Sequence, residues 1–152
     1  MNYTDLLMEA ADEGLTVKEK HLQAYDGRIK GNHIAIRIGM PTAQKACVLA
    51  EELGHKHTTY GDILEQYSIN EQKQEQRARL WAYNKMIGLH GIINSYKHGC
   101  SSLHDMAEFL EVTEEFLSEA LNRYRNKYGC YATIDNYIIY FEPYIAVMEL
   151  YI

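Results

Sequence analysis

The sequence predicts an α+β fold in which helices dominate, with a small sheet near the N-terminus and a second β element at the end. Apolar residues recur at helical spacing through 43–56 and 70–87. Isoleucine alternates with other residues over 34–38, directly after turn-forming residues. β-Branched and aromatic residues gather at 131–141. Helical spacing in the middle and strand-like segments on both sides favour this class.

Length and composition narrow the class of protein. The chain has 152 residues, 47% hydrophobic and 24% charged, which suits one domain with a real core. The net charge of -6 argues against a general affinity for nucleic acid or anionic membranes. The sequence has no secretory signal or membrane-spanning run, and its three cysteines form no pairing motif. We therefore expect a cytoplasmic protein with reduced thiols and no membrane association.

The N-terminal half is expected to contain two helices with a hairpin between them. The first helix spans 4–13, with Thr4 as a plausible N-cap, and a short extended stretch follows at 15–17. The hairpin covers 24–37 and turns at Lys30-Gly31-Asn32. The second helix spans 43–56, with Thr42 as a candidate N-cap.

The remaining elements follow in the same way. Residues 57–69 are mixed, with a break at Gly61-Asp62, and a long helix runs from about 70 to 87, which 90–95 extends. Two shorter helices fit 103–110 and 114–127, with Thr113 as the N-cap of the second. A second hairpin is expected over 131–141, around Asp135-Asn136.

The segment Glu51-Glu52-Leu53-Gly54-His55 carries the candidate chemistry. Metallopeptidase helices place two metal-ligating histidines four residues apart on one face, and a glutamate after the first acts as general base. With His55 as the second histidine, Glu52 takes the general-base position and Glu51 replaces the first histidine. A carboxylate can ligate zinc, and this harder donor set also admits manganese. His57 is a weaker candidate than Glu51, because it does not share the helical face of His55.

A second segment, Glu75-Gln76-Arg77-Ala78-Arg79-Leu80-Trp81-Ala82, strengthens this interpretation. Its glutamate is followed by alanine at i+3, an aromatic residue at i+6 and alanine at i+7, and it resembles the second motif of the ImmA/IrrE family. The stretch 46–50 and the order of elements also resemble that family, most clearly over 30–90.

The resemblance implies a zincin-like, zinc-dependent endopeptidase. Glu75 would be a metal ligand beside His55 and Glu51, and Glu52 would be the catalytic base. The substrate would be a protein partner such as a helix-turn-helix repressor of a phage or mobile element. We predict a single metallopeptidase-like domain over 1–152, with the metal-site core in 1–96 and a helical pair and C-terminal hairpin in 97–152.

Two alternatives remain open. Without the first histidine, the chain could be a catalytically inactive homologue that binds the same partner. The pair 103–110 and 114–127 also resembles a helix-turn-helix, which would suit a DNA-binding regulator. However, Glu114 and Glu115 stand at the start of the would-be recognition helix and would repel phosphates, so direct nucleic-acid binding is not expected.

Overall fold

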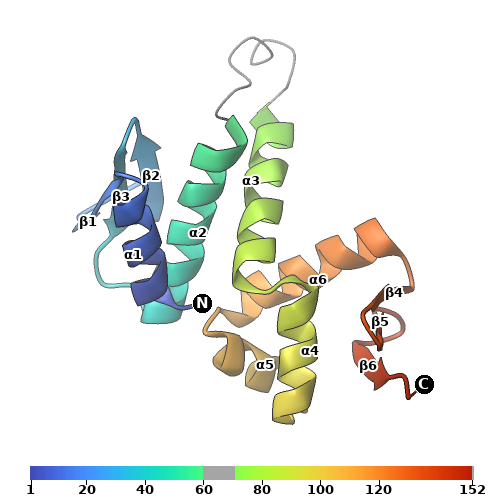
Figure 1. Cartoon of the computed structure of the whole chain (residues 1–152). Helices are drawn as coiled ribbons and strands as arrows, with labels where there is room; N and C mark the ends of the chain where they lie inside the picture. The colour runs from blue at the N-terminus through green and yellow to red at the C-terminus, as the bar shows by residue number, and fades with distance from the viewer. Residues whose placement is uncertain (60–70, 152) are drawn as a thin grey trace. The chain divides into compact units, whose positions relative to one another are not determined.

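The computed structural model describes the chain except residues 60–70 and 152 and divides it into two compact units, Met1–Met86 and Ile87–Ile152. Helices dominate and two small sheets accompany them (Figure 1), which confirms the predicted α+β class. No helix in the described part of the chain is long and apolar enough to cross a membrane. The single domain over 1–152 stays a prediction.

The first unit contains three helices and a three-stranded sheet within its described residues. A capping box starts the first helix: the Asn2 side chain accepts from the backbone N–H of Asp5, and the Asp5 carboxylate accepts from that of Asn2. The prediction of Thr4 as N-cap was therefore wrong, because the N-cap is Asn2 and Thr4 lies inside the helix. The elements are α1 (Tyr3–Asp12), β1 (Thr16–Lys20), β2 (Gly27–Lys30), β3 (His33–Arg37), α2 (Thr42–Thr59) and α3 (Glu71–Met86).

The sheet of this unit has the order β1-β3-β2. Strands β2 and β3 form the predicted antiparallel hairpin. Strand β1 is longer than the expected 15–17 stretch and runs parallel to β3, from the Thr16–His33 pair to the Lys20–Arg37 pair. Helix α2 lies between the sheet and α3 (Figure 1), and Ile34 and Ile36 of β3 are buried. Because of the strand order, β2 lies at one edge of the sheet, and it contacts α2.

The second unit is built from three helices and a second three-stranded sheet. The Thr113 hydroxyl accepts from the backbone N–H of Phe116 at 3.1 Å, which confirms the predicted N-cap. The predicted hairpin is confirmed by antiparallel pairing of β4 and β5, and a third strand, β6, adds to it. The elements are α4 (Gly88–His98), α5 (Leu103–Leu110), α6 (Glu114–Tyr128), β4 (Tyr131–Ile134), β5 (Tyr137–Tyr140) and β6 (Ala146–Glu149).

Residues 90–95 do not extend the long helix. Helix α3 ends at Met86, and a separate helix begins at Gly88, which has a φ of +64°. That left-handed conformation is available to glycine and interrupts the helical path. The predicted break at Gly61-Asp62 lies outside the described residues.

Candidate active site

Helices α2 and α3 touch backbone to backbone at one position. A Cβ atom at Gly54 would lie 2.3 Å from the carbonyl oxygen of Ala78, so only glycine fits there. Ala50 and Ala82 are also fully buried, and their small side chains are consistent with close packing of the two helices. Gly54 directly precedes His55, and Ala78 follows Glu75 by three residues. The close contact therefore fixes where those two side chains meet.

His55 and Glu75 come together across this contact. The His55 Nε2 atom lies 3.1 Å from Glu75 Oε2. The other carboxylate oxygen, Oε1, lies 3.1 Å from Nε of Arg79, one turn further along α3. The side chains of His55 and Glu75 are 27% and 40% exposed, so solvent reaches the pair. The structure thus brings together two of the three predicted ligands, from two different helices.

Glu52 lies on α2 one turn before His55. Burial raises the pKa of its carboxyl to about 7, and the charges of Glu51 and Glu75 add to the increase. The absent side chain of Gly27 in β2 makes room for Val48 and for this carboxyl, because a Cβ there would lie 2.5 Å from Cγ1 of Val48 and 3.2 Å from both Cγ and Oε1 of Glu52. At neutral pH the group exchanges readily between its two protonation states, which suits an acid and base.

Glu51 contributes charge to the same region. It raises the pKa of Glu52 and also that of the Arg79 guanidinium. Among the residues that the structure describes, however, no group of three or more histidine, cysteine, aspartate or glutamate side chains converges as a metal site. The convergence of Glu51 with the His55–Glu75 pair is therefore not seen, and its role as third ligand stays a prediction.

The chemistry of the His55–Glu75 pair fits a divalent ion. Two ligands at about 2.1 Å from a tetrahedral zinc lie roughly 3.4 Å apart. The observed separation of 3.1 Å between Nε2 and Oε2 is close to that value. An imidazole with carboxylates suits zinc and, with its hard oxygen donors, manganese. The two side chains contact each other directly at this distance, and together they would supply two of the ligands of such an ion.

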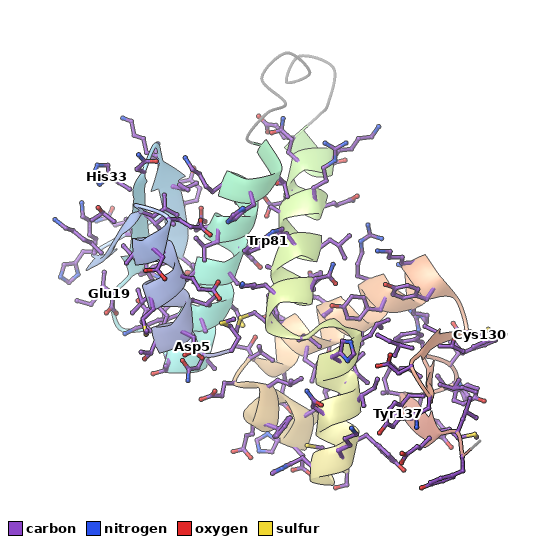
Figure 2. All side chains as sticks on the ribbon, in the orientation of Figure 1. Asp5, Glu19, His33, Trp81, Cys130 and Tyr137 are labelled. Atoms are coloured by element: carbon purple, nitrogen blue, oxygen red, sulfur yellow. The ribbon has the colours of Figure 1, made fainter. Side chains whose placement is uncertain are left out.

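His57 points to different partners. Its Nε2 lies 3.0 Å from each carboxylate oxygen of Glu13. Its ring stacks on Trp81, with centroids 4.7 Å apart and planes 9° apart. Trp81 lies on α3, where that helix runs beside α2 (Figure 2). Because α2 continues through Thr59, His57 stays off the helical face of His55.

Three residues of the site were not predicted from the sequence. Arg79 had a detectable signal, because a glutamate and an arginine four residues apart on a helix face each other. Gly27 had none, since its contact with Glu52 depends on how the sheet packs against α2. Gly54 lay inside the motif, but its packing against Ala78 requires the partner helix to be known.

Helices α2 and α3 are thus joined by a histidine–glutamate pair, with a half-buried glutamate one turn away on α2. The Peptidase_M78 family model, described as the IrrE N-terminal-like domain, matches residues 10–122. The chain belongs to this ImmA/IrrE family of peptidase type. A comparison with the curated proteins found no match. The matched range contains both α2 and α3, and therefore the whole candidate site.

Proposed function

We propose that the chain is a metal-dependent endopeptidase that uses the α2–α3 pair to cleave a protein partner. His55, Glu75 and Glu51 would hold a zinc or manganese ion, and Glu52 would be the general base. The observation that carries this proposal is the 3.1 Å approach of His55 Nε2 to Glu75 Oε2 from separate helices. Membership of a peptidase-type family supports it.

The protein's own residues would handle the proton. A bound divalent ion supplies Lewis acidity to a hydrolytic site. Glu52 would take a proton from the attacking water and pass it to the leaving amine. A pKa of about 7 suits both steps, because near neutral pH neither protonation state of Glu52 is costly to reach. Burial is the main cause of that pKa.

An extended peptide is the substrate form that this site suits. Strand β2 is an edge strand of its sheet, and Gly27 at its start lies against Glu52. Edge strands bind extended peptides by backbone hydrogen bonds. A peptide added along β2 would therefore pass beside the Glu52 carboxyl. We propose that the partner is a helix-turn-helix repressor of a phage or mobile element, cleaved in the cytoplasm without direct contact with nucleic acid.

A cleavage assay with matched variants tests the proposal. The intact protein is loaded with zinc or manganese and incubated with a candidate helix-turn-helix repressor of a phage or mobile element, and fragments are identified by mass spectrometry. Cleavage is expected from the wild type and from Glu71→Gln, an exposed glutamate of α3, but not from Glu52→Gln. Binding of the repressor without cleavage by any variant would instead support the catalytically inactive homologue.

A further inference from the structure

The carboxylate of Glu75 is divided between two partners. Oε2 faces His55 Nε2 and Oε1 faces Arg79 Nε, each at 3.1 Å. Arg79 comes from the same helix, four residues later, so its guanidinium reaches Glu75 without any change in the packing of α2 against α3. The carboxylate of Glu75 therefore contacts both His55, which is another predicted metal ligand, and Arg79, which is permanently charged.

The surroundings of Arg79 are strongly acidic. Burial lowers the pKa of its guanidinium, but the charges of Glu51 and Glu75, the hydrogen bond with Glu75 and the nearby Tyr83 together outweigh burial and raise it. The same two glutamates also raise the pKa of Glu52. The positive charge of Arg79 thus lies in the field that would attract a divalent ion, and it offsets part of the repulsion among the three carboxylates.

We propose that Arg79 is an internal competitor of the metal ion, holding Glu75 in the metal-free protein and weakening divalent-ion binding there. An ion that reaches Glu75 Oε2 must enter beside a guanidinium already bonded to the other oxygen of that carboxylate. The two cations repel each other, and because they would lie closer together than the Debye length, salt does not fully screen this repulsion. The inference rests on the proposed function, because it concerns the same ligands.

A simpler role makes a different prediction. As a surface ion pair within one helix, Arg79–Glu75 would contribute only a few tenths of a kcal/mol to stability. Loss of Arg79 would then leave metal affinity unchanged, or lower it by letting the Glu75 side chain move. Competition predicts the opposite sign, so the direction of the change in affinity distinguishes the two roles.

Competition titrations against a chromophoric chelator, with Zn²⁺ as the probe, test the inference on the full chain. Arg79→Gln is expected to tighten zinc binding about tenfold, because a neighbouring positive charge is removed. Arg79→Lys keeps the charge and should stay close to the wild type. Arg77→Gln changes an exposed arginine of the same helix and should have no effect. The double variant His55→Ala/Arg79→Gln should lose the gain.

Each outcome has a definite meaning. Zinc binding by Arg79→Gln that is equal to or weaker than that of the wild type overturns the competition, while the proposed function stands if binding still depends on His55. A gain that survives in the double variant also overturns it, because the ion would then be bound elsewhere. If no variant binds zinc or manganese, the inference and the proposed function fail together.

Discussion

The close contact of α2 with α3 at Gly54 can be tested with a single methyl group. A Cβ at this position would lie 2.3 Å from the carbonyl oxygen of Ala78, 3.0 Å from its carbonyl carbon and 3.2 Å from its Cα. All three are backbone atoms, so no side-chain rotation relieves the clash. Ordinary contact would require the helices to separate by roughly 1 Å. The Gly54→Ala change would therefore move His55 away from Glu75 by a similar amount.

Two opposing effects set the change in stability. Alanine is more favourable than glycine inside a helix by about 1 kcal/mol. Overpacking a tight contact costs about 1–3 kcal/mol. We expect a net loss of about 1 kcal/mol in the free energy of unfolding, measured by urea denaturation. Metal affinity, measured by chelator competition, should fall about tenfold or more, because the two ligands no longer meet at one ion.

Gly91 in α4 provides the matched control. It is also a buried helical glycine, but a Cβ there would lie 3.4 Å from the nearest atom, Cδ2 of Leu110. The Gly91→Ala change should therefore be neutral or stabilise the protein by up to about 1 kcal/mol, and should not alter metal affinity. The reasoning is refuted if Gly54→Ala matches this control, with the full gain in helix propensity and unchanged metal binding.

Three further predictions concern the surroundings of the site. The folded-state pKa of Glu52, about 7, is above its usual value of 4.5, so metal-free protein should lose up to about 3 kcal/mol of stability as pH rises from 4.5 through 7. Thermal melts in EDTA should show this loss for the wild type. An identical loss for Glu52→Gln would contradict the prediction. Gly27→Ala would place a methyl group 2.5 Å from Cγ1 of Val48 and 3.2 Å from Oε1 of Glu52, so it should shift both side chains and slow cleavage about tenfold with unchanged metal content, whereas an unchanged rate would count against that contact. His57→Ala removes the contacts with Glu13 and Trp81 and should lower stability by about 1 kcal/mol in urea denaturation, and a simultaneous loss of bound metal would contradict its place outside the site.

Local patterns in the sequence predicted much of the fold and part of the site. The helical spacing around His55 and the motif around Glu75 placed both residues on helices, and the structure brings them together. Pairing between distant segments was beyond such patterns. The parallel pairing of β1 with β3 depends on contacts that no short stretch encodes. Strand β6 is different, because it pairs with its neighbour in the sequence, β5. The interruption at Gly88 lay within an otherwise helical stretch, where a single glycine is only a weak signal.

Glu51 leads to the last prediction, because it occupies the position of the first histidine in the motif. On a helix, residues 51 and 55 lie four positions apart and face the same side, so Glu51→His would offer two imidazoles to one ion. Each exchange of a carboxylate for an imidazole makes the site softer and favours zinc over manganese. We expect the ratio of zinc to manganese affinity to rise about tenfold in Glu51→His. Glu51→Gln, which removes the charge without adding an imidazole, should weaken binding of both ions. An unchanged ratio in Glu51→His would mean that residue 51 does not face the ion, and that its carboxylate acts on the site only through its charge.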